Sequence, residues 1–175
     1  MAVHWIVLLC AIFPLWLLQN VIHELSHGLT IWLGWKWKFS IYPFPSKKLG
    51  RFTFAHVIYE KAEGSEDISA IGMALVAIMP KITNILFVLK AQIWATISIG
   101  IPSIAIVILL FAWFNFVDFI VGALAIFKSA NESDIWKFQS YTNIRPKLIR
   151  GSVIGWTIYL LICNIAGTVF VLTHI

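Results

Sequence analysis

The sequence predicts an all-α membrane protein with about four transmembrane helices and a short membrane-associated β-hairpin after the first. Of its 175 residues, 60% are hydrophobic and only 12% are charged. These are too few charges to cover the surface of a soluble globule of that length. Because no repeat or polar second domain interrupts the apolar runs, we expect residues 1–175 to form one membrane domain.

The four spans are expected where apolar runs reach the ~20 residues that a bilayer requires: residues 3–33, 68–89, 103–127 and 152–173. The first is long enough to tilt or to extend beyond the hydrocarbon. Gly100, Ile101 and Pro102 predict a break before the third span. Residues 91–102 should either prolong the second helix or lie at the outer interface, and a further crossing there would change the topology.

The second span holds polar residues that need an explanation. Ser65 or Asp67 is the expected N-cap of its helix. Pro80 is tolerated inside a membrane helix where neighbouring groups satisfy the freed backbone. Lys81 is expected to extend along the helix to the far interface, towards Lys90, with a role in holding a carboxylate or substrate as the alternative.

The hairpin is expected over residues 35–60. From Trp35 to Tyr42, apolar residues alternate with polar ones, which is the two-residue period of a half-buried strand. A turn with prolines and a glycine and a second extended run, residues 51–59, follow. The hairpin could cover a polar interior or offer an edge strand to an extended peptide. We expect His56 on it to pack rather than to bind metal.

Basic residues set the expected orientation. All but two of the thirteen Lys and Arg lie in two loops, residues 36–61 and 128–150. With four spans both loops fall on one side, so the positive-inside rule places them in the cytoplasm and both termini outside. Orientation in the bilayer thus explains the excess of basic over acidic residues, and we expect no nucleic-acid partner.

The most specific motif is His23-Glu24-Leu25-Ser26-His27 in the first span. Four residues amount to roughly 400° of helix, so both imidazoles project from nearly one face and can bind one metal ion. This is the HExxH arrangement, in which two histidines bind Zn²⁺ and the glutamate is the general base on the metal-bound water. A lone histidine in an apolar helix is usually a core residue, but ionisable groups within a span are costly and indicate function.

Depth in the membrane selects a third ligand. His23 and His27 precede Leu33 by ten and six residues, and Asp118 precedes Lys128 by ten. At 1.5 Å per residue all three lie roughly 9–15 Å from the cytoplasmic boundary. Asp118 is therefore the expected third ligand.

Other polar residues are alternatives. Glu132 and Asp134 lie in the second polar loop, where a solvated charge is the ordinary explanation. Asp134 could still bind the metal if that loop folds inward. Asn115, one turn before Asp118, could orient the carboxylate or bind substrate backbone, with packing between helices as an equal alternative.

Together these features resemble the intramembrane zinc metalloproteases of the site-2 protease family and the compact zincin peptidases related to it. The resemblance rests on the HExxH motif, the hairpin after it, Pro80 and Asn84 in the next helix and Asp118 in a later one. The family's Gly-Pro-x-x-Asn element stands here as residues 79–84, without the glycine and with one extra residue; its Leu-Asp-Gly element is reduced to Val117-Asp118-Phe119. No PDZ domain is inserted, so substrate selection would use the core itself or a partner protein.

The resemblance implies a hydrolase that cleaves membrane-embedded or membrane-proximal proteins, with Zn²⁺ held by His23, His27 and Asp118. Glu24 would be the general base, and Asn84 would contact the substrate; Asn115, from its place one turn before Asp118, is a second candidate for that contact. The alternative is a non-catalytic membrane protein that binds or carries a metal through the motif. A membrane oxidase with several histidine boxes is a weaker hypothesis, because the remaining histidines are isolated in the sequence.

Overall fold

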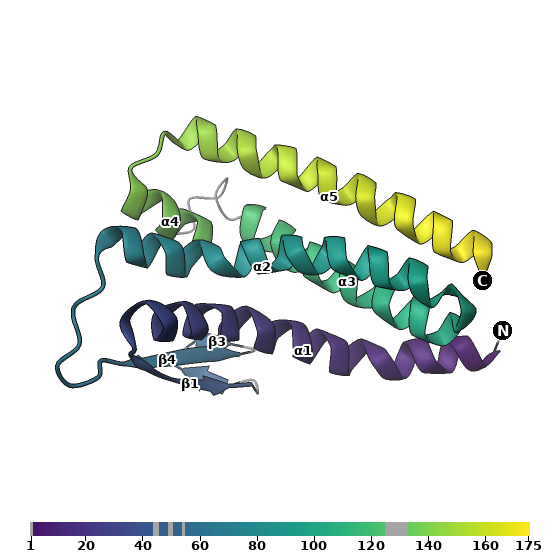
Figure 1. The fold of residues 1–175 in the computed structure, drawn as a ribbon, viewed down its shortest axis with the longest axis horizontal. Helices are drawn as coiled ribbons and strands as arrows, with labels where there is room; N and C mark the ends of the chain where they lie inside the picture. The colour runs from purple at the N-terminus through teal and green to yellow at the C-terminus, as the bar shows by residue number, and fades with distance from the viewer. Residues whose placement is uncertain (1, 44–45, 49–50, 54, 125–132) are drawn as a thin grey trace.

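The computed structural model describes residues 2–43, 46–48, 51–53, 55–124 and 133–175. These residues form an elongated helical bundle with both chain ends at one end and the hairpin and α4 at the other (Figure 1). Four helices are long and apolar enough to cross a membrane. The predicted fold class is confirmed, and the chain is a multi-pass membrane protein.

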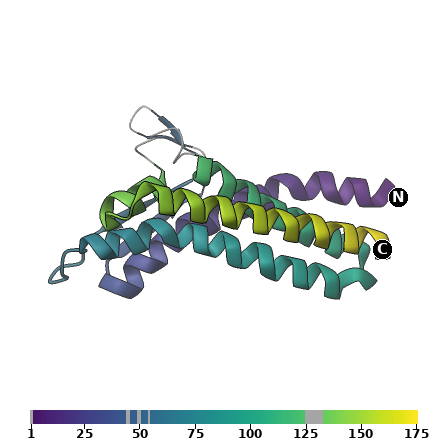
Figure 2. The ribbon, with the colours of Figure 1, turned by 90° about the horizontal axis from the view of Figure 1, so that it is seen from above.

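The first span is one continuous helix, α1 (Ala2–Trp35), of 34 residues with Pro14 inside it. At 1.5 Å per residue it is about 50 Å long, against a hydrocarbon thickness of about 30 Å. The expected excess length is confirmed. Towards the N-terminus α1 stands apart from α5, as the view from above shows (Figure 2).

The hairpin consists of two nested antiparallel pairs. Strand β1 (Lys38–Tyr42) pairs with β4 (His56–Glu60), and β2 (Ser46–Lys48) pairs with β3 (Arg51–Thr53). Along β1, exposed residues alternate with half-buried ones, as the sequence pattern predicts. The hairpin lies beside α1 (Figure 1), and its strand β4 lines a cleft together with residues of the HExxH motif.

The second and third spans are α2 (Ala70–Ile97) and α3 (Pro102–Leu124), joined by a single turn of 3₁₀ helix, η1 (Ser98–Gly100). Residues 91–97 therefore prolong α2, and the described residues contain no further crossing there. The N-cap of α2 is Ser69, whose hydroxyl accepts a hydrogen bond from the Gly72 N–H. The expected caps were wrong: Asp67 pairs with Lys61, and the Ser65 hydroxyl donates to the Ala62 carbonyl.

The polar segment after α3 contains a short helix that the sequence analysis did not predict. This helix, α4 (Asp134–Thr142), is capped by the Ser133 hydroxyl and ends at Asn143 in the left-handed conformation. The last span, α5 (Pro146–His174), starts six residues before the expected position 152 because Pro146 is well placed in a first helical turn. Residues 125–127, expected to end the third span, lie outside the described residues.

Helix α2 is central, since it contacts α1, α3, α4 and α5. Alanines bury their small side chains on α2 and α3, which lets membrane helices approach closely: Ala74, Ala77, Ala91, Ala95, Ala105, Ala112 and Ala123. A larger apolar cluster joins α2, α3, α4 and α5 near the hairpin end. The bundle thus holds α1, α2 and α4 together at the level of the motif.

The contact between α1 and β1 depends on Gly28. A Cβ atom at Gly28 would lie 2.4 Å from the Phe39 ring, whereas one at Gly34 would meet nothing within 4 Å. We expect Gly28→Ala to lower the free energy of unfolding by about 1–3 kcal/mol, as overpacking does. Gly34→Ala should be neutral or stabilising, because alanine is the better helix former. Detergent-solubilised protein unfolded by denaturant would test this; equal stability of the two variants would contradict the packing.

Candidate metal centre

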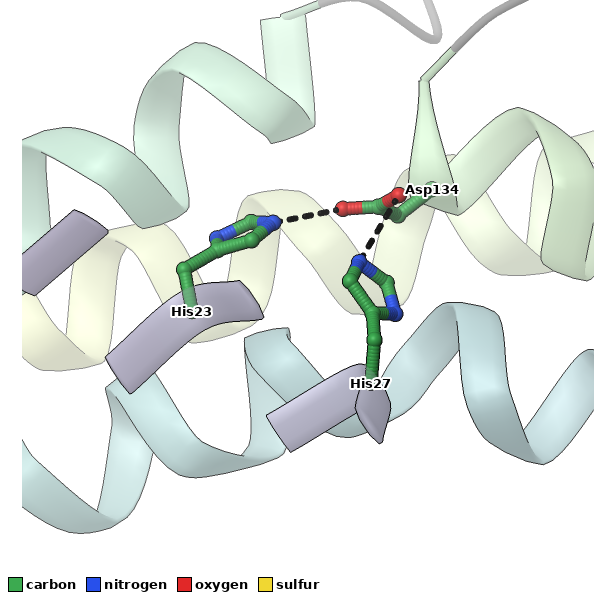
Figure 3. A group of neighbouring side chains, drawn as sticks. All are labelled: His23, His27 and Asp134. Carbon is green, nitrogen blue, oxygen red and sulfur yellow. Dashed lines mark ion pairs between the residues drawn. The ribbon is translucent and has the colours of Figure 1, made fainter. Parts of the chain in front are cut away.

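The two histidines of the motif lie one turn apart on α1, as the spacing predicts. The His23 and His27 ring centroids are 5.3 Å apart and the rings are inclined at 70°. Both side chains are largely buried, with 15% and 11% of their surface exposed. The rings project from α1 towards the first turn of α4 (Figure 3).

The carboxylate of Asp134 faces both rings (Figure 3). Its Oδ2 lies 3.2 Å from Nε2 of His23, and its Oδ1 lies 3.5 Å from Nε2 of His27. Within the described residues, these three side chains are the one group of His, Cys, Asp or Glu whose ligand atoms are close enough to share an ion. Bonds of about 2.1 Å at the tetrahedral angle would separate two ligand atoms by about 3.4 Å. The two distances are close to this value, and each ends on a different oxygen of Asp134.

The other nitrogen of each ring is held by an acceptor. Nδ1 of His23 donates to Oδ2 of Asp118 at 2.9 Å, and Nδ1 of His27 donates to the Val76 carbonyl at 2.8 Å. A carbonyl and a carboxylate oxygen only accept, so each Nδ1 carries a proton. Each Nε2 atom therefore faces the Asp134 side; without a metal, Nε2 of His23 donates to Asp134, and a bound metal would take the place of that proton.

Asp118 lies at the depth of His23, as expected, but behind the ring. Its Oδ2 accepts hydrogen bonds from three donors: His23 Nδ1, Lys81 Nζ at 3.2 Å and Asn84 Nδ2 at 2.5 Å. This arrangement differs from the predicted role of Asp118 as third ligand. The carboxylate that faces the two Nε2 atoms is that of Asp134, the alternative that required the polar loop to fold inward.

Lys81 turns into the bundle and does not extend to the far interface as expected. The residue is only 3% exposed, and its Nζ donates to the backbone carbonyl as well as to Oδ2 of Asp118. Its side chain passes Gly122, where a Cβ would lie 2.4 Å from Cε and 2.5 Å from Nζ. The glycine leaves the space through which the ammonium group reaches Asp118.

Helix α4 brings Asp134 to the histidines. Ile135, next in the chain, is 1% exposed and belongs to the apolar cluster of α2, α3, α4 and α5. Burial raises the pKa of Asp134, but its hydrogen bond with His23 and its attraction to His27 outweigh burial and lower the pKa to about 2. The side chain is thus an ionised carboxylate at neutral pH, which suits a cation. The available sequence signal was the capping residue Ser133, with the apolar residues Ile135 and Trp136 directly after Asp134.

Glu24 lies in a cleft of about 400 Å³ next to the three candidate ligands. It accepts a hydrogen bond from the backbone N–H of Val57 in β4. Burial and the carboxylates of Glu24 and Asp134 raise the pKa of Tyr59. Its phenol therefore stays protonated and can donate a hydrogen bond. Strand β4 and helix α4 line the rest of the cleft with Ala55, His56, Val57, Tyr59, Lys137 and Tyr141.

Four further residues were singled out in the sequence as candidates or alternatives. His56 stacks on Tyr42 with ring centroids 4.9 Å apart, which agrees with the expected packing role. Asn84 and Asn115 are fully buried, and neither is among the described residues that line the cleft. Asn84 instead donates to Asp118, and Asn115 donates to the Phe111 carbonyl of its own helix. Glu132 lies outside the described residues.

No family model, curated protein or solved structure matches the chain.

The buried ion pair behind His23 gives a stability prediction. Replacing Lys81 with methionine keeps the length of the side chain but leaves Asp118 without its cation, and breaking one partner of a buried pair costs about 3–5 kcal/mol. Lys90→Met, on the same helix but exposed, should change the stability by less than about 0.5 kcal/mol. Denaturant unfolding in detergent measures both; a Lys81→Met variant as stable as Lys90→Met would contradict the pairing.

Proposed function

We propose that this protein is an intramembrane zinc metalloprotease that hydrolyses peptide bonds of membrane-embedded or membrane-proximal substrates. One observation carries the proposal: two imidazole nitrogens and one carboxylate lie close enough to share an ion, beside Glu24 in a cleft. In the proposed site His23, His27 and Asp134 hold the metal, and Asp118 orients His23.

The donor set suits zinc. Two histidines and one carboxylate with an open fourth position are a common ligand set of catalytic zinc, and hard cations such as Mg²⁺ prefer sites made of oxygen alone. When bound, Zn²⁺ supplies a Lewis acid that polarises the scissile carbonyl and lowers the pKa of a water molecule.

The protein's own residues supply the proton transfers. Glu24 accepts the proton of the attacking water and passes it to the leaving amine. The Val57 N–H holds the carboxylate of Glu24 in the cleft. The phenol of Tyr59, which lines the same cleft, can donate to the substrate carbonyl as negative charge develops on its oxygen.

A substrate would bind in an extended conformation, because the carbonyls of an intact helix are paired and shielded. Among the described residues β4 pairs only with β1, so one of its edges has no partner strand, and Val57 and Tyr59 of β4 line the cleft. An edge of this kind can add a peptide strand through backbone hydrogen bonds. The described residues form no PDZ-like module, so the core itself or a partner protein would select the substrate.

The proposed orientation places the hairpin and α4 at the cytoplasmic side and both termini outside. The two basic segments, residues 36–61 and 128–150, contain these elements, and basic loops stay in the cytoplasm. The separation of the two ends supports this arrangement, since the termini lie together at the far end of the bundle (Figure 1). The proposed cleavage then occurs near the cytoplasmic face of the bilayer.

The Glu24→Gln variant tests the proposal. It removes the base and leaves all three proposed ligands, so zinc content should be unchanged while cleavage falls by at least about 10²-fold. Purified protein in detergent would be assayed with fluorescein-labelled casein and with zinc analysis in parallel. Glu60→Gln, an exposed substitution at the end of β4, is the matched control and should retain activity.

Two results would contradict this assignment. Undiminished cleavage by Glu24→Gln would exclude Glu24 as the base. The second result has three parts: the wild type binds zinc but cleaves nothing, Glu24→Gln has no effect, and His23→Ala loses the metal. This result would favour the alternative of a membrane protein that binds or carries a metal without catalysis.

A further inference from the structure

The carbonyl that holds His27 belongs to a helix in which carbonyls are normally occupied. In an α-helix, the carbonyl of residue i accepts from the N–H of residue i+4. Val76 lies in α2, yet its carbonyl accepts the Nδ1 proton of His27 at 2.8 Å. Four residues after Val76 the chain has Pro80, which has no N–H to donate.

The three groups are buried together, so water does not compete for them. His27 is 9% exposed, Val76 is 4% exposed, and Pro80 is less than 2% exposed. A backbone carbonyl without a partner at membrane depth is costly. The imidazole therefore supplies the hydrogen bond that the proline cannot, and in return receives a fixed acceptor for Nδ1.

We propose that Pro80 is a positioning residue of the metal centre. By removing one backbone donor it keeps the Val76 carbonyl available, and that carbonyl fixes the tautomer and orientation in which His27 presents Nε2 to Asp134. The inference rests on the proposed function, because it assigns to Nε2 the task of binding metal. Groups that hold the second nitrogen of a metal-binding histidine commonly tune the affinity of the site.

The Pro80→Ala substitution should restore a backbone donor for the Val76 carbonyl. Its N–H would point along α2 to the Val76 carbonyl and compete with the imidazole for it. Since proline is the poorest helix former and alanine the best, the same change should not weaken the helix. Pro80→Ala should therefore weaken metal affinity without lowering stability. A purely structural role of Pro80 does not predict this difference.

The test compares zinc affinity of the purified full chain in detergent, measured by competition with a chelator. Pro80→Ala should weaken zinc binding by about 10–100-fold, the usual loss when the partner of a ligating histidine is removed. The melting temperature of the metal-free variant should not fall below that of the wild type. Wild-type zinc affinity in Pro80→Ala would overturn the inference.

Two matched variants control the experiment. Pro14→Ala replaces the proline inside α1, away from the motif, and should leave zinc affinity unchanged. Thr83→Val removes a hydrogen bond from the Ser26 hydroxyl to Thr83 between α1 and α2, 3.0 Å long, without supplying a donor to Val76. If either control weakened zinc binding as much as Pro80→Ala, loosened packing would explain the loss and the inference would fail.

A second measurement needs no metal and separates this inference from the proposed function. Nitrogen-15 NMR of histidine-labelled, metal-free protein reports which nitrogen of His27 carries the proton. We expect Nδ1–H in the wild type and a shift towards Nε2–H in Pro80→Ala. The same tautomer in both proteins would overturn the inference even if zinc binds; a wild type that binds no zinc but shows the shift would refute the proposed function alone.

Discussion

A histidine that offers one ring nitrogen to a metal inside a membrane must find an acceptor for the proton on the other. Water is scarce at that depth, so the acceptor has to come from the protein. His23 uses the Asp118 carboxylate and His27 uses the Val76 carbonyl. The rest of the centre depends on these two hydrogen bonds, because they turn both Nε2 atoms to the side where Asp134 lies.

Helix α2 supplies most of this support although none of its residues is a proposed ligand. The carbonyl of Val76 faces one histidine, while Lys81 and Asn84 hold the carboxylate that faces the other. The positive charge of Lys81 balances Asp118 in a part of the bundle where an isolated charge would be costly. Its central place among α1, α3, α4 and α5 explains why one helix can serve both histidines.

The sequence predicted the parts of this structure that are set by local patterns. Apolar runs gave the four spans, alternation gave the hairpin, and the spacing of His23 and His27 gave two imidazoles on one face. Counting residues from the membrane boundary placed Asp118 beside His23 correctly. It could not decide which ring nitrogen Asp118 would face, because that depends on how α3 is rotated against α1.

The position of Asp134 could not be predicted for a related reason. Helix α4 is short and mixed in polarity, and a sequence of this kind is typical of a solvated loop. The burial of Ile135 in the cluster shared by four helices, with Phe138 packed against it, holds α4 in the bundle and brings its first turn to the histidines. The central claim is that Asp134 completes the metal site and Asp118 does not. Zinc analysis of purified Asp134→Asn and Asp118→Asn, each loaded with excess zinc and then desalted, tests it most directly. The account predicts that Asp134→Asn loses the metal and that Asp118→Asn keeps it with weakened affinity; zinc kept by Asp134→Asn and lost from Asp118→Asn would contradict it.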